Sequence, residues 1–372
     1  MLKLNRTEEI LFALLQMALH GQPVTDIDWK TVTEQEWKEV FLLSIKQGVR
    51  AVAFDGIGKI EIPIALDKGL KMKWVGAVMG LENAFHKKKQ AASDFAAAMD
   101  GNSLHTMVLK GLSFSTYYPE PSHREFGDLD CYIVPGSLPD VEWGHGYEQG
   151  NVVAENIGAA VRRSYYKHSH ISYKGLAIEN HQYFLPIRGK KADKALERHL
   201  RSVAFPSDYE PRYVGESKLL IPSADFNALF MTAHSMNHFL YETIRLRHVC
   251  DWALLLKAEQ DRVDWESFYR WCDKMHYTRF VNCLNYICHH CLGIELCDAL
   301  KEDAGHAALV LNEIWRGENL YNRGYGKFVA RILLVKNFFQ SSWKYRKICQ
   351  RSALGSLLTH GVGVLFDRNP TV

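Results

Sequence analysis

The chain of 372 residues contains 47% hydrophobic, 12% aromatic and 23% charged residues and carries a formal net charge of +3. This composition excludes a disordered protein, and the length is enough for two or three packed segments. Glu8 and Glu9 interrupt the N-terminal stretch and no uncharged apolar run reaches about 18 residues, so we expect neither a signal peptide nor a membrane span. Eight cysteines in a chain of this length do not indicate a disulfide framework. We therefore expect reduced thiols and a cytoplasmic protein.

Apolar residues at helical spacing predict helices through the first hundred residues. The first predicted helix ends at Gly21, and a second begins at the capping pattern that opens with Thr33. A long helix is predicted over residues 74–101, where a glycine ends it. These helices define an expected N-terminal helical segment over residues 1–101.

The periodicity changes after this segment, and short apolar runs predict a small mixed sheet over residues 102–215. The predicted elements are strands at 106–111 and 129–134, a helix at 151–166, and a strand hairpin at 170–184 that turns at Lys174-Gly175. We expect this segment to form an α/β core between two helical segments.

Helical patterns return at Ser223, which is a candidate N-cap, and predict a helical C-terminal region over residues 216–372. The predicted helices cover 224–241, 245–258, 264–275 and 279–293. Residues 319–366 carry eight Lys or Arg and no Asp or Glu, which leaves a charge of −5 on the rest of the chain. Such a basic tail fits a solvated helix face, and it also fits the binding of an anionic partner. The eight residues are Arg323, Lys327, Arg331, Lys336, Lys344, Arg346, Lys347 and Arg351.

Two aspartates, Asp128 and Asp130, stand where the second predicted strand begins. They share one face of the strand because side chains alternate with period two, and their like charges repel. A divalent metal would offset this repulsion, and Glu179 on a later strand would complete a set of oxygen ligands of the kind that Mg²⁺ prefers. Two such ions would hold the attacking and leaving oxygens of an in-line phosphoryl displacement.

The motifs around these aspartates resemble a known family. An apolar run that ends in Lys110-Gly111, the stretch "YYPEPSHR" that ends at Arg124, and "GDLD" at 127–130 are similar, in this order, to the signature of an uncharacterised nucleotidyltransferase family. That family belongs to the DNA polymerase beta-like nucleotidyltransferase superfamily. "AIENH", which contains Glu179, and "LRHVCDWALLL" resemble later parts of the same family. The resemblance covers most of the chain from about residue 100 to 290, and more loosely the N-terminal helices.

The resemblance implies an α+β fold, in which a nucleotidyltransferase-like small mixed sheet is flanked by N-terminal helices and a mainly helical C-terminal region. It implies Mg²⁺-dependent transfer of a nucleoside monophosphate from an NTP to an unidentified acceptor hydroxyl, with release of pyrophosphate. The implied cofactor is a pair of Mg²⁺ ions, for which Mn²⁺ can substitute. The implied ligands and catalytic residues are Asp128, Asp130 and Glu179, and the implied nucleotide-binding residues are Lys110, Gly111, Ser113 and Arg124.

Other interpretations of these residues stay open. Arg124 also fits an ion-pair partner that orders its loop, and Lys110 fits a lysine at a strand end that reaches solvent. The chain as a whole also fits a catalytically inactive module that binds nucleotide or nucleic acid, because fold does not imply function. A γ-phosphoryl transferase would use the same metals.

Three histidines, His168, His170 and His181, flank Glu179 in the sequence. They fit ordinary exposed strand positions, and one of them also fits a role in orienting the acceptor or the leaving group.

Residues in the C-terminal region allow both structural and functional interpretations. His234 and His238 share one helix face and fit packed histidines better than zinc ligands. The "CHHC" stretch at 288–291 fits buried thiols on an apolar helix better than a zinc cluster. Arg245 and Arg247, with Asp251 four residues after Arg247, fit an ion pair on a helix surface, and the two arginines also fit cleft-facing positions.

Overall fold

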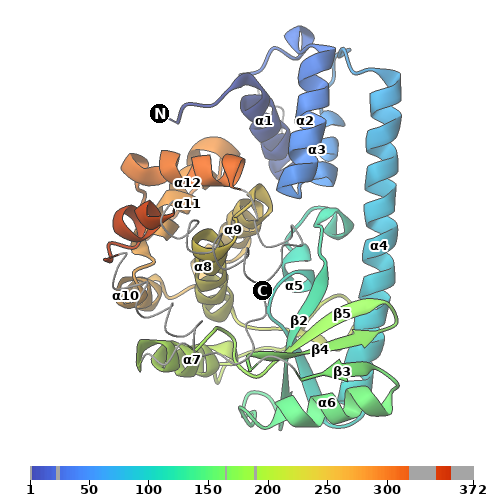
Figure 1. Ribbon diagram of the computed structural model, residues 1–372, viewed down its shortest axis with the longest axis vertical. Coiled ribbons are helices and arrows are strands. Elements are labelled where there is room, and N and C mark those ends of the chain that lie inside the picture. Colours follow the sequence, from blue (N-terminus) through green and yellow to red (C-terminus); the bar gives the residue numbers. More distant parts are fainter. Residues whose placement is uncertain (1, 22–25, 164–165, 188–190, 318–340, 353–372) are drawn as a thin grey trace, which may run out of the picture.

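The chain folds as a mixed α+β protein in the computed structural model, with one seven-stranded sheet between N-terminal helices and a helical C-terminal region (Figure 1). This arrangement confirms the fold class expected from the sequence. The residues that the structure describes are 2–21, 26–163, 166–187, 191–317 and 341–352.

The N-terminal segment consists of four α-helices with well-defined ends. They are α1 (Arg6–His20), α2 (Glu34–Gln47), α3 (Arg50–Ile57) and α4 (Lys68–Asp100), with a short 3₁₀ helix η1 (Trp29–Thr31) before α2. Gly21 ends α1 in the left-handed conformation, at a φ of 75°, and the predicted capping box at Thr33 is present. The long predicted helix is confirmed and begins six residues earlier than expected. It runs along one side of the molecule (Figure 1).

The sheet combines parallel and antiparallel pairs in the order β3-β4-β5-β2-β1-β7-β6. Its strands are β1 (Leu104–Val108), β2 (Asp128–Pro135), β3 (Ala160–Arg162), β4 (His168–Tyr173), β5 (Leu176–His181), β6 (Arg212–Tyr213) and β7 (Leu219–Ile221). β2 pairs antiparallel with β1 and parallel with β5, so β2 lies at the centre of the sheet. The predicted strands at 106–111 and 129–134 correspond to β1 and β2.

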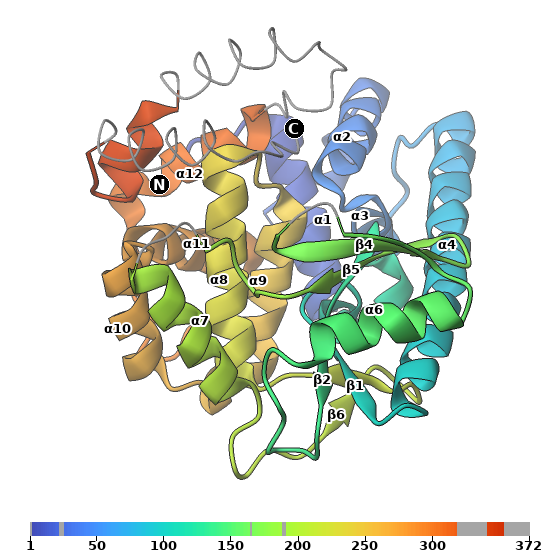
Figure 2. The ribbon, with the colours of Figure 1, turned by 60° about the horizontal axis from the view of Figure 1, so that its bottom comes forward.

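Side chains of β2 alternate between two cores, one on each face of the sheet. Leu129, Cys131 and Ile133 pack with residues of α4 and of α6 (Gly146–Asn156). Tyr132 and Val134 face the other way, toward the core that includes α7 (Lys191–Ala204) and α8 (Ala224–Tyr241). Figure 2 shows α6 lying across the sheet, with α7, α8 and α10 on the opposite side of the molecule from α4. By period two, Asp128 and Asp130 lie on the face that looks toward the C-terminal helices.

The prediction of a helix over residues 151–166 is wrong at both ends. α6 begins at Gly146 and ends at Asn156, and residues 160–162 form β3 instead. Gly158 ends the helical path at a φ of 81°, a backbone conformation that side chains with a Cβ avoid. The early start depends on Gly146, because a Cβ there would lie 2.0 Å from the Ile133 backbone oxygen of β2. The absence of that carbon lets α6 pack directly against the strand.

The predicted hairpin is confirmed as β4 and β5, joined by a two-residue turn. Lys174 and Gly175 both have positive φ angles, of 47° and 77°, as tight hairpin turns require. The two strands pair antiparallel from Tyr173↔Leu176 to His168↔His181.

The C-terminal region is helical as expected, and its packing reaches back to the start of the chain. Its remaining elements are α9 (Leu246–Glu259), η3 (Gln260–Arg262), α10 (Trp265–Met275), α11 (Thr278–Leu292), α12 (Ala304–Arg316) and a π-helical turn η5 (Lys344–Ile348). Ser223 caps α8 by accepting a hydrogen bond from the Phe226 N–H. α1 packs on α11, so both ends of the described chain share one core.

None of the described helices combines the length and apolar character that crossing a bilayer requires. The division at residues 101 and 215 stays a prediction.

Candidate active site

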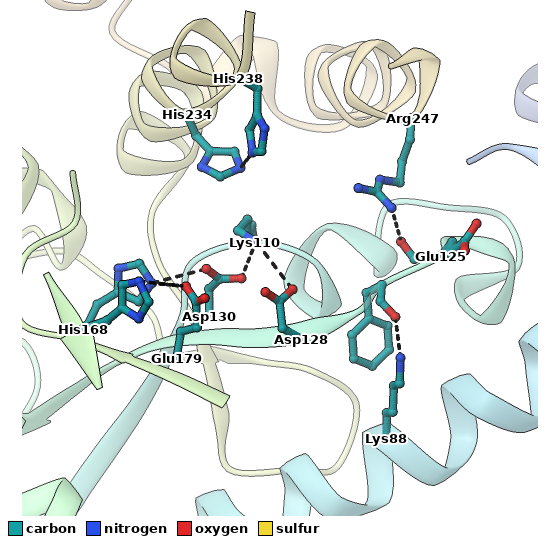
Figure 3. Close-up of polar contacts among 12 residues, drawn as sticks. Lys88, Lys110, Glu125, Asp128, Asp130, His168, Glu179, His234, His238 and Arg247 are labelled. Carbon is teal, nitrogen blue, oxygen red and sulfur yellow. Dashed lines mark hydrogen bonds and ion pairs between the residues drawn. The ribbon is translucent and has the colours of Figure 1, made fainter. Parts of the chain in front are cut away.

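Asp128 and Asp130 begin β2 and present both carboxylates on the face toward α8 (Figure 3). The side chain of Asp130 is buried, with 4% exposed, whereas that of Asp128 is 39% exposed. A short helix, α5 (Leu112–Ser115), and the 3₁₀ helix η2 (Pro121–His123) fill the chain between β1 and β2. The two aspartates therefore lie where the strand emerges from this connection.

Glu179 on β5 stands beside Asp130 because β2 and β5 pair in parallel. The register places the two residues directly opposite one another. Their side chains share one face of the sheet, since Leu176 and Ile178 of β5 pack into the core on the other face. The structure thus brings together the three carboxylates that the sequence singled out, from two strands about fifty residues apart.

The ammonium of Lys110 lies between the two aspartates (Figure 3). It forms an ion pair with Asp130 Oδ2, and its Nζ is 3.7 Å from Asp128 Oδ1. Burial opposes charge on the Asp130 carboxyl, but Lys110 and a contact with His181 outweigh it and hold the pKa of Asp130 well below its usual value. Burial and the neighbouring Asp130 raise the pKa of Asp128. Lys110 therefore does not reach freely into solvent, and it partly compensates the repulsion between the aspartates.

The three histidines near Glu179 surround its carboxylate. His181 Nε2 lies 3.5 Å from Glu179 Oε2 and 3.2 Å from Asp130 Oδ1. His168 Nε2 is 3.5 Å and His170 Nδ1 is 3.9 Å from the Glu179 carboxylate. Burial lowers the pKa of His168 to about 3, although Glu179 acts in the opposite direction. Two of the three are buried, so the interpretation as ordinary exposed strand residues holds only for His170.

Gly111 and Ser113 follow Lys110 but differ in their access to the site. Gly111 lines a cavity of about 220 Å³ together with Lys110 and Asp128. Its φ of 68° is reached without strain only by glycine, so the backbone turns sharply beside the carboxylates. Ser113 lies on α5 with its hydroxyl buried and without a hydrogen-bond partner, and it is not part of the cavity lining.

Arg124 pairs with Asp251 of α9 in the interior. Its Nε and Nη2 donate to the two carboxylate oxygens over 3.1 and 2.5 Å, and Tyr118 donates its hydroxyl to the same aspartate over 2.8 Å. The interpretation of Asp251 and Arg247 as a surface pair is therefore wrong, because Asp251 is fully buried and its carboxylate faces Arg124. The interpretation of Arg124 as an ion-pair partner agrees with this geometry.

The opposite wall of the cavity comes from α8 and α9, and the cleft-facing position that the sequence left open for Arg247 agrees with this wall, whereas the sequence did not assign His234, His238 and His248 to it. His234, His238, Arg247 and His248 line the cavity across from Asp128. His234 and His238 point toward Lys110 and lie 3.0 Å apart between their Nε2 atoms (Figure 3). His238 also contacts Glu242 at 2.9 Å. The helical spacing of the two histidines was visible in the sequence, but nothing there showed that α8 faces the sheet.

The other sequence candidates lie away from this cavity. Cys288 and Cys291 are free and buried, whereas the two histidines between them are exposed beside Glu302, which agrees with buried thiols on an apolar helix. Of the basic tail, Arg323, Lys327, Arg331 and Lys336 lie outside the described residues. Lys344 is described and is buried against Glu313, so it adds nothing to an exposed basic surface. An anionic partner of the tail stays a prediction.

The donor set beside β2 fits a divalent metal. Ligand atoms of Asp130, Glu179 and His181 lie within 4.8 Å of one another, and Asp128 extends the set along the strand. Among the described residues, Lys110 is the ammonium that forms an ion pair with these three carboxylates, and the negative charge that remains favours a cation of higher charge. Carboxylate oxygens suit Mg²⁺ and Mn²⁺, and an added imidazole is also compatible with Mn²⁺.

Comparison with known proteins agrees with the motifs. A family model described as an uncharacterised nucleotidyltransferase matches residues 33–293, which is more than half of the chain. This range contains the sheet, the three carboxylates and the wall of the cavity formed by α8 and α9. No curated protein and no solved structure matches the chain significantly.

Proposed function

The chain belongs to the uncharacterised nucleotidyltransferase family, and we propose that it transfers a nucleoside monophosphate from an NTP to an acceptor hydroxyl. The observation that supports this most directly is the placement of Asp128, Asp130 and Glu179. Asp130 and Glu179 face each other on parallel strands, and Asp128 lies on the same face of β2. Asp128 and Lys110, which contacts both aspartates, line a cavity that a basic and histidine-rich wall closes on the other side.

We assign the divalent metal to Asp128, Asp130 and Glu179. When bound, it would supply Lewis-acid polarisation of the phosphoryl oxygens and neutralise charge that develops there. Lys110 contacts Asp128 and Asp130 with its ammonium. Once these carboxylates serve as ligands, the same ammonium is placed to contact a phosphate oxygen as a point charge.

Glu179 would orient the acceptor hydroxyl and take up its proton. The acceptor oxygen forms a bond to the α-phosphorus while the bond from that phosphorus to the bridging oxygen breaks, and pyrophosphate leaves with the electron pair. His181 and His168, whose rings stack on one another, both contact the Glu179 Oε2 atom and so position its carboxylate. Burial opposes ionisation of Glu179, but the His181 contact outweighs it and lowers its pKa, so the carboxylate is ionised at neutral pH and can accept a hydrogen bond from the acceptor hydroxyl.

Gly111 would bring the backbone close to the triphosphate, because its lack of a side chain leaves room beside the carboxylates. The triphosphate roles of Ser113 and Arg124 stay predictions. Neither is favoured by its surroundings, since the Ser113 hydroxyl is buried in α5 and the Arg124 guanidinium is engaged by Asp251.

Label transfer tests this proposal. The purified protein is incubated with Mg²⁺, with NTPs labelled at the α or at the γ position, and with sugar, peptide and RNA acceptors. We expect transfer of the α-label with an equal amount of pyrophosphate released, and a loss of about 100-fold or more in Asp130→Asn. Asp298→Asn, which changes an exposed aspartate in the loop after α11, is the control and should keep full activity.

The same experiment distinguishes the alternatives. Transfer of the γ-label with release of NDP would identify a γ-phosphoryl transferase instead. NTP binding without transfer of either label would identify an inactive binding module. Unchanged transfer in Asp130→Asn would contradict the assigned site.

A further inference from the structure

Arg247 on α9 is a guanidinium that no carboxylate of the described residues neutralises. It lines the cavity together with Lys110 and Asp128, yet none of the carboxylate oxygens in the described chain lies within 4.0 Å of its nitrogens. Its Nη1 donates to the Glu125 carbonyl oxygen over 3.3 Å (Figure 3), whereas its Nε is buried and has no hydrogen-bond partner among the residues that the structure describes. A charged group that has a buried hydrogen-bond donor without an acceptor raises the free energy of the folded protein. A ligand that brings an acceptor to this donor would remove that cost.

Arg124 provides the contrast within the same cavity. Its guanidinium is engaged by both oxygens of Asp251 and by the Glu125 carbonyl oxygen. Removing it from Asp251 would leave a buried carboxylate uncompensated. Arg124 thus forms a structural ion pair, whereas Arg247 still has hydrogen-bond donors with which it can bind a ligand.

The electrostatics of the wall favour an anion at Arg247. Burial and the nearby positive charge of Arg124 lower the pKa of Arg247 and outweigh the opposite effect of Asp251 and Glu125, in agreement with the missing direct ion pair among the described residues. Burial also lowers the pKa of His234 and of His248, so both are neutral at pH 7 and add no positive charge of their own. Arg247 is therefore the main cationic group of this wall, opposite the carboxylates and Lys110.

We infer that Arg247 binds the terminal phosphate groups of the nucleotide, which makes α9 part of the polyphosphate-binding wall. This inference rests on the proposed function, because nucleotidyl transfer places the α-phosphate at Asp128 and Asp130. Arg247 lines the same cavity without contacting either carboxylate, which is the position for phosphates beyond the α-phosphate. The planar fork of a guanidinium suits bidentate contact with phosphate oxygens.

Binding of inorganic tripolyphosphate and of a non-hydrolysable NTP, both with Mg²⁺, tests this role by titration calorimetry. We expect Arg247→Gln to weaken both ligands by about 10-fold to 100-fold, because a charge-assisted hydrogen bond to phosphate is lost. Arg247→Lys should recover part of this loss, since it restores the charge but not the fork. Arg270→Gln, which removes an exposed arginine on α10, is the control and should bind as the wild type does.

Thermal unfolding separates binding from a structural role. Arg247→Gln should keep or raise the unfolding midpoint in the absence of ligand, because it removes a partly buried charge that has no direct ion pair among the described residues. A large drop in the midpoint, with unchanged affinity per folded molecule, would show that Arg247 is structural and would overturn the inference.

The outcomes distinguish this inference from the proposed function. Wild-type affinity in Arg247→Gln, beside loss of transfer in Asp130→Asn, would overturn the inference and leave the function standing. Loss of tripolyphosphate binding in Arg247→Gln, in a wild type that transfers no label, would support Arg247 as a polyphosphate ligand and contradict nucleotidyl transfer. If the wild type binds neither ligand, both are wrong.

Discussion

Replacing Asp251 by asparagine removes the anion that neutralises Arg124 in the protein interior. The Asp251 carboxylate is fully buried and accepts hydrogen bonds from Arg124 Nε, Arg124 Nη2 and the Tyr118 hydroxyl. The guanidinium that remains is itself 94% buried, so water cannot replace the lost partner. Breaking a buried pair in this way costs about 3–5 kcal/mol, and we expect Asp251→Asn to lower the free energy of unfolding by that amount.

Urea unfolding at pH 7, followed by tryptophan fluorescence, measures this loss. The double variant Asp251→Asn/Arg124→Met leaves neither charge uncompensated, so its loss should be smaller than the sum of the two single losses by at least about 1 kcal/mol. Glu155→Gln is the control, since it weakens a solvent-exposed pair with Arg163 and should leave the transition unchanged. Single losses below about 1 kcal/mol, or strictly additive losses, would refute the buried pair as the contact that joins the loop before β2 to α9.

Two further predictions concern the packing around the sheet. Burial opposes charge on His123, but Asp55 and Glu82 outweigh it and raise its pKa to about 9. The stabilisation of the folded state by protonated His123 is complete below the unfolded-state pKa of about 6.5 and is lost as the pH rises through about 9. The calorimetric unfolding midpoint of the wild type should therefore fall between pH 7 and 9.5, and that of His123→Gln should fall less. Equal pH dependence in the two proteins would contradict this. Gly146→Ala should lower the free energy of unfolding in urea by about 1–3 kcal/mol, because its Cβ would lie 2.0 Å from a β2 backbone oxygen. Gly80→Ala on α4 is the control, because no atom of the described residues lies within 4 Å of the added carbon, and it should raise the free energy of unfolding by about 0.5–1 kcal/mol. A similar change in the two glycine variants would refute the close contact between α6 and β2.

Local chemistry made several features predictable from the sequence. Alternation along a strand is enough to place Asp128 and Asp130 on one face. The hairpin at Lys174-Gly175 and the cap at Ser223 depend on residues adjacent in the chain, and the structure has both. The helix expected over 151–166 failed because short apolar runs fit helix and strand alike, and the stop signal at Gly158 was not used.

The contacts of Glu179, Arg247 and Asp251 depend on long-range packing, which local sequence patterns do not predict. Whether Glu179 faces Asp130 depends on the parallel register of β2 and β5, which no local pattern specifies. Arg247 and Asp251 lie four residues apart on α9, and this spacing fitted a surface pair as well as a cleft-facing arginine. Tertiary packing instead buries Asp251 against Arg124, whereas Arg247 donates to the Glu125 carbonyl oxygen beside the cavity.

Under the proposed function, the carboxylates of β2 hold a metal that binds nucleotide. Titration calorimetry of a non-hydrolysable NTP, with and without Mg²⁺, tests it in the wild type and in Asp128→Asn/Asp130→Asn. We expect binding that requires Mg²⁺ in the wild type and is absent in the double variant. Equal binding by both proteins, or wild-type binding that is indifferent to Mg²⁺, would contradict the claim.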